Sequence, residues 1–557
     1  MQNTILIHAP GRRQGRGALV LAYTALFALL MGIWAAIFAL NGQSFIQYGD
    51  TLKQHYPFLV YYGRWLRQAA RCVLTGAAVP TWDFSIGYGA DIITTLSYYG
   101  LGDLLAAFVP GRRPEQLLEG LIVLRLYLAG LAFMAFSRRH GNSRFGTLLG
   151  ALAYVFSAWP IQAGLIEPVF LVPMYCFPLM LLGADDLFEG RSPVLYIAAI
   201  ALTALSNFLF FYMAAMLLVL YAIAVYSKRY GAKNLRTLPP LLAKFIGFAL
   251  VGIAISAVTL LPTAQELFGS ARFGLTRETA PYPFYRFFEL LANMTTGMGY
   301  DAYSTYAGVT SAAFLGVLVL FAKPRQNTVL KCAWLGLLAL LLVPQAGSVL
   351  NGISYVSNRW VWAFTMLEAF ILARVCPGIT AFEPKEKRNL FALLAVYCVV
   401  AFCVKQGRTE TALLGALLLA VMVTIAFVNV VVRYCTPFSF AWTEELTINF
   451  FVWIVLLGSA RSFRDGSHLG MSILYDALPK SLRFCCYLLS MALCLGFFGA
   501  LAWTGWLEVR DEYELEVISE ALAVPVWWYT IATPLFSVLT IFRMLQRACA
   551  DLRSGSY

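Results

Sequence analysis

Long apolar stretches recur along the whole chain, and the short segments between them hold most of the charged residues. Many stretches have the length of about 17–25 residues that a helix needs to cross a bilayer. Because lipid offers the backbone no hydrogen-bond partner, helices are the expected element. The pattern predicts an all-α, polytopic integral membrane protein with about 14–15 transmembrane helices in two bundles. The predicted segments are 18–40, 118–137, 145–160, 167–183, 193–206, 208–227, 242–262, 305–322, 330–344, 359–375, 389–404, 411–432, 446–461, 482–506 and 525–543.

The composition fits this class and excludes a soluble globular protein. Of the 557 residues, 60% are hydrophobic and 13% are charged, whereas a soluble protein carries about 25% charged residues. The net charge of +12 is explained by Lys and Arg in cytoplasmic loops. Since no soluble domain carries a basic patch, we expect no nucleic-acid partner.

Basic residues cluster at every second loop, which fits the positive-inside rule with the N-terminus inside. The run 18–40 is too long for a signal-peptide core and lacks a small-residue cleavage site, so we expect it to be a retained first helix. The long aromatic-rich loops 41–117 and 263–304 then fall outside. The basic clusters are Arg138/Arg139/Arg144, Lys228/Arg229/Lys233/Arg236, Lys323/Arg325/Lys331 and Lys385/Lys387/Arg388.

The helix count conflicts with the charges of the last third. Counting from the N-terminus makes 411–432 run inward, but the later basic residues require it to run outward. If the 16-residue segment 389–404 were half-spanning or interfacial, one span fewer would precede 411–432, and 411–432 would then run outward. Alternatively, an earlier span is misassigned or the two halves are mismatched. A polar hinge at 405–410 divides the chain into 1–405 and 406–557.

Residues 442–471 carry acid at one end of an apolar run and basic residues with a His at the other. Glu444 and Glu445 at a helix N-terminus complement the helix dipole, and Thr443 can cap the first turn. Arg461 and Arg464 follow at the end that would reach the cytoplasm. The acidic segment 508–522 is expected outside by the same rule.

This last third resembles the small permease subunit (DctQ family) of tripartite ATP-independent periplasmic (TRAP) transporters. The resemblance extends over about 140 residues in order, spacing and four-span layout. It is carried by Arg433-Tyr434, Trp442-x-Glu444-Glu445-Leu446, Phe451-x-Trp453, Leu457-Gly458, Arg464-x-Gly466-x-His468-Leu469, Leu478-Pro479 and Arg483.

The resemblance implies a non-catalytic scaffold in a bacterial cytoplasmic (inner) membrane, seated in lipid. Its implied partners are a large, ion-coupled permease subunit and a periplasmic solute-binding protein that delivers an organic acid such as a dicarboxylate or sialic acid. A plain structural role as cap, dipole partner or snorkelling side chain is the alternative for each carried-over residue. The implied subunit-contact or membrane-anchor residues are Arg433, Trp442, Glu444, Glu445, Arg464 and His468.

The first outer loop combines carboxylates with aromatic rings. Asp50, Asp83 and Asp91 are interleaved with Trp and Tyr residues. Rings can stack on sugar faces, and a carboxylate can take a proton from an acceptor hydroxyl. These three aspartates are therefore candidate catalytic residues.

This region resembles the YfhO family of bacterial membrane proteins, which is placed among GT-C-type glycosyltransferases. The resemblance covers about 1–380. YfhO-type proteins continue well past that point, so this chain would contain a truncated form of them. It implies transfer of a sugar from a polyprenyl-phosphate carrier, with Asp50 as general base and Arg359 as phosphate partner. It is carried by Gly49-Asp50, Gln54, Tyr56, Trp82-x-Phe84-x-x-Gly87-x-Gly89, Tyr98-Tyr99, Leu260-Leu261-Pro262-Thr263, Tyr306-Ala-Gly308 and Ser357-Asn358-Arg359-Trp360.

Three interpretations stay open at this point. The chain is a TRAP small permease fused to a YfhO-like membrane domain, a GT-C-type transferase with an accessory domain, or a fusion in which neither activity survives. Asp50 is alternatively a helix-end carboxylate, and Arg359 an interfacial anchor.

No cofactor or metal is expected. The eleven Cys are scattered without a C-x-x-C pair or a Cys/His cluster, so they are expected to fill apolar space. His468 has no second His nearby. Gly87-x-Gly89 lacks the third Gly and the βαβ setting of a dinucleotide site.

Overall fold

The structure is a computed structural model in which the chain forms two compact units, Met1–Val404 and Lys405–Tyr557. We describe each unit by itself. The described residues are 16–95, 101–109, 113–231, 235–269, 290–291, 293–295, 305–378, 382–403, 445, 448–449, 451–456, 458–459, 480–519 and 524–554.

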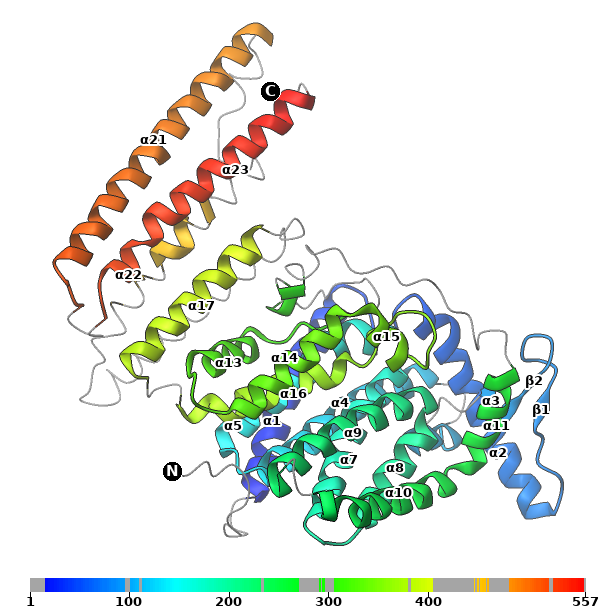
Figure 1. The fold of residues 1–557 in the computed structure, drawn as a ribbon. Coiled ribbons are helices and arrows are strands. Elements are labelled where there is room, and N and C mark those ends of the chain that lie inside the picture. Colours follow the sequence, from blue (N-terminus) through cyan, green and yellow to red (C-terminus); the bar gives the residue numbers. More distant parts are fainter. Residues whose placement is uncertain are drawn as a thin grey trace. The chain divides into compact units, whose positions relative to one another are not determined.

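The first unit is a bundle of helices (Figure 1). The predicted all-α, polytopic class is confirmed: nine helices in the described part of the chain are long and apolar enough to cross a membrane. In its described residues the α-helices are α1 (Arg16–Leu40), α2 (Tyr56–Thr75), α3 (Ile92–Thr95), α4 (Pro114–Arg139), α5 (Arg144–Val155), α6 (Gly164–Ile166), α7 (Val172–Phe188), α8 (Val194–Ser206), α9 (Phe208–Tyr230), α10 (Leu238–Ile255), α11 (Ala257–Gly269), α13 (Ser311–Ala322), α14 (Thr328–Leu342), α15 (Pro344–Leu350), α16 (Val361–Val375) and α17 (Pro384–Cys403).

The core of the unit lies among α4, α5, α7 and α16. Small residues let α5 approach α16 closely, as is common between membrane helices. A Cβ added at Gly146 would lie 2.4 Å from the carbonyl oxygen of Ala373, and one at Gly150 would lie 2.7 Å from that of Ala369. The surrounding space is filled by large buried side chains such as Phe133.

Several predicted spans are interrupted. The expected span 242–262 breaks at Ser256 into α10 and α11. α14 and α15 are bent by 95° at Val343, where Pro344 cannot donate a helical hydrogen bond. Counting α14 and α15 as one span would add a tenth candidate.

The segment between α1 and α4 contains secondary structure that the apolar pattern does not predict. α2 is amphipathic and buries Leu59, Tyr62 and Gly63. A two-stranded antiparallel hairpin follows, with β1 (Trp82–Asp83) paired to β2 (Ala90–Asp91). α3 and the 3₁₀ segment Leu101–Ala107 complete a small apolar cluster with α2 and the start of α4.

Contacts between distant segments give the first unit a basic end. The guanidinium of Arg139 bonds Glu189 at 2.6 Å, and Arg374 donates to the carbonyl of His140 at 2.9 Å. Lys323 donates to the carbonyl of Gly378 at 3.0 Å. The ends of α4, α7, α13 and α16 therefore meet where the basic clusters lie.

The second unit is described mainly by a helical hairpin. α21 (Lys480–Glu514) packs along α23 (Ala532–Ser554), with the short α22 (Trp527–Thr530) between them (Figure 1). Trp453 packs edge-on against Phe536 of α23, with ring centroids 5.6 Å apart. The predicted segment 411–432 and part of 446–461 lie outside the described residues.

Candidate functional site

The strongest site in the described chain surrounds a broken helix between α5 and α7. This segment, Trp159–Leu171, consists of a π-helical turn, one α-helical turn and a 3₁₀ turn. Pro160 and Pro168 lack the N–H that a continuous helix needs. Irregular backbone at a bundle end frees polar groups for contacts with side chains from other elements.

The turn Thr51–His55, which precedes α2, docks on this segment. The hydroxyl of Thr51 donates to the carbonyls of Leu165 and Ile166. The Nε2 of His55 contacts a carboxylate oxygen of Glu167, with 3% of the His55 side chain and 20% of the Glu167 side chain exposed. A largely buried imidazole–carboxylate pair can hold or transfer a proton.

A buried ion pair supports the residue next to Glu167. The Nη2 of Arg125 bonds both carboxylate oxygens of Asp103, at 2.6 and 2.7 Å. Its Nη1 donates to the carbonyl of Pro168 at 3.1 Å. Both side chains are at most 6% exposed, so this pair fixes the position of the 3₁₀ turn.

The predicted residue Arg359 contacts the same 3₁₀ turn. Its guanidinium carbon stands 5.2 Å from the ring centroid of Phe170 and 5.8 Å from that of Tyr355. Its buried Nε has no hydrogen-bond partner within the described residues. The indole of Trp159 holds Phe170 by donating to its carbonyl at 3.1 Å. Arg359 can therefore offer an N–H to an anion.

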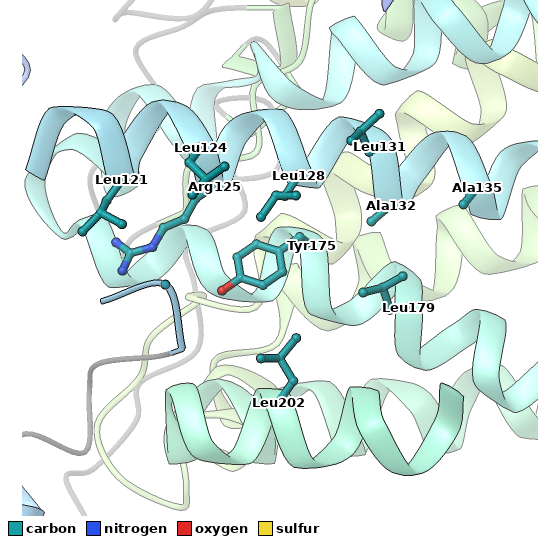
Figure 2. A pocket seen from close by; sticks show the side chains of 11 residues that line it. Leu121, Leu124, Arg125, Leu128, Leu131, Ala132, Ala135, Tyr175, Leu179 and Leu202 are labelled. Atoms are coloured by element: carbon teal, nitrogen blue, oxygen red, sulfur yellow. The ribbon is translucent and has the colours of Figure 1, made fainter. Parts of the chain in front are cut away.

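An apolar cavity of about 440 Å³ lies beside the site, between α4, α7 and α8. Figure 2 shows Arg125 towards one end of its lining and Tyr175 projecting between α4 and α8. The remaining lining is leucine, alanine and glycine. Because Arg125 also bonds the carbonyl of Pro168, the cavity adjoins the turn that carries Glu167.

Asp50, the predicted base, immediately precedes the docked turn and is exposed. The structure thus places Asp50 and Arg359 on elements that contact the same broken helix. No direct contact between their side chains is found among the described residues. Thr51, His55, Glu167, Asp103 and Arg125 were missed as functional residues in the sequence. The sequence contains one signal of this site, because Arg125 places a charge inside the apolar run 118–137.

The other two predicted aspartates make local bonds away from this site. Asp83 accepts from the hydroxyl of Tyr61 at 2.6 Å and from the backbone N–H of Ser85 at 2.8 Å. These bonds hold the pKa of Asp83 below its ordinary value. Asp91 accepts from the backbone N–H of Thr94 at 2.8 Å, so it caps α3.

In the second unit, Glu445 is the one predicted contact residue that the structure describes. Its carboxylate lies beside the hydroxyl of Tyr529 in α22, so Glu445 contacts the short helix that connects α21 and α23. The remaining predicted contact residues lie outside the described residues: Arg433, Trp442, Glu444, Arg464 and His468. Among the residues that are described, no group of three or more His, Cys, Asp or Glu could hold a metal ion.

Two family models match the chain, and both predicted resemblances are confirmed. The model described as "Bacterial membrane protein YfhO" matches residues 22–463. The model described as "Tripartite ATP-independent periplasmic transporters, DctQ component" matches residues 422–554. The two matches overlap at 422–463.

Individual proteins show the same two similarities. The C4-dicarboxylate TRAP transporter small permease protein DctQ of Rhodobacter capsulatus is 33% identical over 117 residues, covering 21% of this chain and 52% of that protein. The ectoine TRAP transporter small permease protein TeaB of Halomonas elongata is 28% identical over 173 residues, covering 31% and 88%. The uncharacterized protein YfhO of Bacillus subtilis is 24% identical over 336 residues, covering 57% and 37%. The chain spans about half the length of the first curated relatives it matches.

Proposed function

The chain belongs to the YfhO family of bacterial membrane proteins and carries a DctQ domain, and from this we propose that it is the small scaffold subunit of a TRAP transporter, fused to a YfhO-like membrane module. We propose the boundary near residue 405, with 1–405 as the YfhO-like part and 406–557 as the DctQ-like part. Its partners would be a large permease subunit and a periplasmic solute-binding protein. The assembly would lie in a bacterial inner membrane.

The DctQ match over 422–554 is the single observation that carries this proposal. The exposed apolar surface of α21 supports it. Leu489, Leu493 and Phe497 recur at four-residue intervals and are 62–65% exposed, so they form one stripe on the helix. Lipid or a second membrane subunit can cover such a stripe.

We propose an organic acid as the solute class. The relatives are named for C4-dicarboxylate and for ectoine, so the solute differs among small permeases of similar sequence. A scaffold that does not line the transport path would explain this variation.

Reconstitution tests the scaffold role. Proteoliposomes would contain the full chain, a TRAP large permease subunit and a periplasmic solute-binding protein. Uptake of a C4-dicarboxylate, sialic acid or ectoine should require the chain and should fall at least tenfold when Phe497→Asp and Leu493→Asp are combined. Asp186→Asn in the first unit is the matched control and should leave uptake unchanged. Equal uptake with and without the chain would refute the scaffold role.

The broken-helix site favours a second candidate, glycosyl transfer from a polyprenyl-phosphate sugar. The observation in its favour is the His55–Glu167 pair, which adjoins an apolar cavity that a lipid chain could enter. Here Asp50 or Glu167 would accept the acceptor's proton, and Arg359 would bind phosphate. Sugar transfer in membrane vesicles should then be lost in at least one of the variants Asp50→Asn and Glu167→Gln but kept in Asp186→Asn. Transfer that survives in both site variants would exclude this candidate.

A further inference from the structure

Three side chains from neighbouring helices meet at the basic end of the first unit, away from the site described above. His140 follows α4, Asp185 lies near the end of α7, and Tyr221 lies in α9. The Tyr221 hydroxyl donates to Oδ1 of Asp185 at 2.7 Å and lies 3.3 Å from Nε2 of His140. That nitrogen is 3.5 Å from Oδ2 of Asp185.

The cluster has one hydrogen-bond donor fewer than its acceptors require. Nδ1 of His140 lies 3.0 Å from the carbonyl oxygen of Phe136, which can only accept, so Nδ1 carries the ring proton. In the neutral ring Nε2 is then a lone-pair acceptor. The one proton of Tyr221 is directed at Oδ1 of Asp185. Nε2 and Oδ2 therefore face each other with no proton between them.

The environment makes this arrangement unfavourable without a further proton. The side chains of His140 and Asp185 are 10% and 11% exposed, and Oδ2 is buried without a hydrogen-bond partner in the described structure. The rings of Phe136 and Phe370 pack on the imidazole at centroid distances of 4.3 and 5.5 Å. Water is thereby kept from one side of the pair, and an unpartnered buried acceptor is costly.

We propose that His140, Asp185 and Tyr221 form a binding site for a single proton, held between Oδ2 of Asp185 and Nε2 of His140. The proton comes from the aqueous phase at this end of the bundle and forms an O–H that donates to the imidazole. No other bond changes. Binding completes a hydrogen-bonded ring that ties α4, α7 and α9 together.

Charged side chains from several elements surround the site. Arg139 is engaged by Asp186 at 3.2 Å and by Glu189 at 2.6 Å, and Arg374 of α16 donates to the carbonyl of His140. The charged groups that act on the cluster are Arg139, Asp186, Lys228, Arg229 and Arg374.

Burial is the main reason that the pKa of His140 is lowered to about 4. The bond to Phe136 opposes this shift, and the nearby cations add to it. The ring therefore stays neutral over the physiological range, and the bound proton resides on the carboxyl side of the pair. Below the His140 pKa of about 4, Nε2 is itself protonated and can no longer accept. The bond is therefore present from about that pH to neutral pH and is lost when rising pH removes the proton of Asp185.

Infrared difference spectroscopy of the full chain in lipid nanodiscs tests the site. As the pH is raised from neutral to alkaline, the carbonyl stretching band of a protonated carboxyl should disappear. The band should be absent in Asp185→Asn and should shift in frequency in His140→Gln. Asp186→Asn is the matched control, because it removes the adjacent carboxyl but should leave the band in place.

Two results would overturn the proposal. One is a wild-type spectrum without the pH-dependent band, or with a band that persists in Asp185→Asn. The other is loss of the band at constant pH when choline is replaced by sodium, which would make the site one for a metal cation. The proposal does not depend on the transport function, because the readout needs neither solute nor partner.

Discussion

At the scale of single residues, the Arg125–Asp103 pair is the most buried charge pair of the site. Replacing Arg125 by Met would leave the Asp103 charge in the interior without its guanidinium. Breaking a buried pair in this way costs about 3–5 kcal/mol. We expect a large fall in the thermal denaturation midpoint of the purified full chain in detergent, and partial recovery in Asp103→Asn/Arg125→Met.

Arg510→Met is the matched control for this measurement. Arg510 pairs with Glu514 on the surface of α21, where both side chains are more than half exposed. Solvent screens an exposed pair of this kind, so it contributes little to stability and the midpoint should hardly move. Equal shifts in the two variants would show that the buried pair does not hold the broken helix.

The bond between Tyr61 and Asp83 makes the hairpin sensitive to acid. The Tyr61 hydroxyl and the N–H of Ser85 lower the pKa of Asp83. A lowered pKa means that the bond contributes above the ordinary carboxyl pKa and is lost as the pH falls through the lowered value. In Tyr61→Phe the protonation of Asp83 should begin at a higher pH.

Carbodiimide coupling to Asp83, read by peptide mass spectrometry across a pH series, measures this change. Tyr88→Phe is the control, because the side chain of Tyr88 is fully exposed. If both variants give the wild-type profile, the Tyr61 hydroxyl has no influence on Asp83.

At the scale of elements, local composition was enough to place most helices. The expected spans 18–40, 118–137 and 208–227 became α1, α4 and α9 with shifts of a few residues, because apolar length is a property of consecutive residues. α2 was missed because arginines interrupt its apolar positions. The break at Ser256 was also missed, because the residues on both sides of it are equally apolar.

The residues of the broken-helix site could be predicted only in part, because contacts between distant segments leave no local pattern in the sequence. Asp50 and Arg359 were found through a family motif, and the structure places both around Trp159–Leu171. The His55–Glu167 pair joins residues 112 positions apart in the chain. No periodicity in the sequence predicts this pair, because the two residues come into contact only when α2, α5 and α7 pack together.

The packing of α2 depends on one glycine. A Cβ at Gly63 would lie 2.4 Å from the carbonyl oxygen of Ala106, so Gly63→Ala must push apart α2 and the 3₁₀ segment Leu101–Ala107. We expect a loss of about 1–3 kcal/mol and faster proteolysis of the hairpin. Gly120→Ala in α4 has no atom within 4 Å of the new Cβ and should be neutral or stabilising. Equal proteolysis of the two variants would refute this role of Gly63.

At the scale of the whole molecule, the structure sharpens the conflict between helix count and charge. α17 begins at the basic end, where Asn389 donates to the carbonyl of Ala322 at 3.2 Å. Further along, the ring of Tyr397 packs on Phe314 near the start of α13, with centroids 4.5 Å apart. α17 therefore runs antiparallel to α13 and away from the basic end. Its apolar part is still short, because charged residues occupy its first turn.

Sidedness is the property on which the scaffold proposal depends, and α21 offers a place to measure it. At 35 residues this helix is about 52 Å long, longer than the hydrocarbon core of about 30 Å, so its acidic end projects into water. In a cysteine-depleted chain, Asp511→Cys should react with an impermeant maleimide from the periplasmic side, as should Gly42→Cys, the sidedness control. Lys385→Cys should react only after permeabilisation, because Lys385 lies in the predicted cytoplasmic cluster. Labelling of Asp511→Cys only after permeabilisation would show that the DctQ domain has the opposite orientation in the membrane. A large permease of ordinary orientation could not then pair with it.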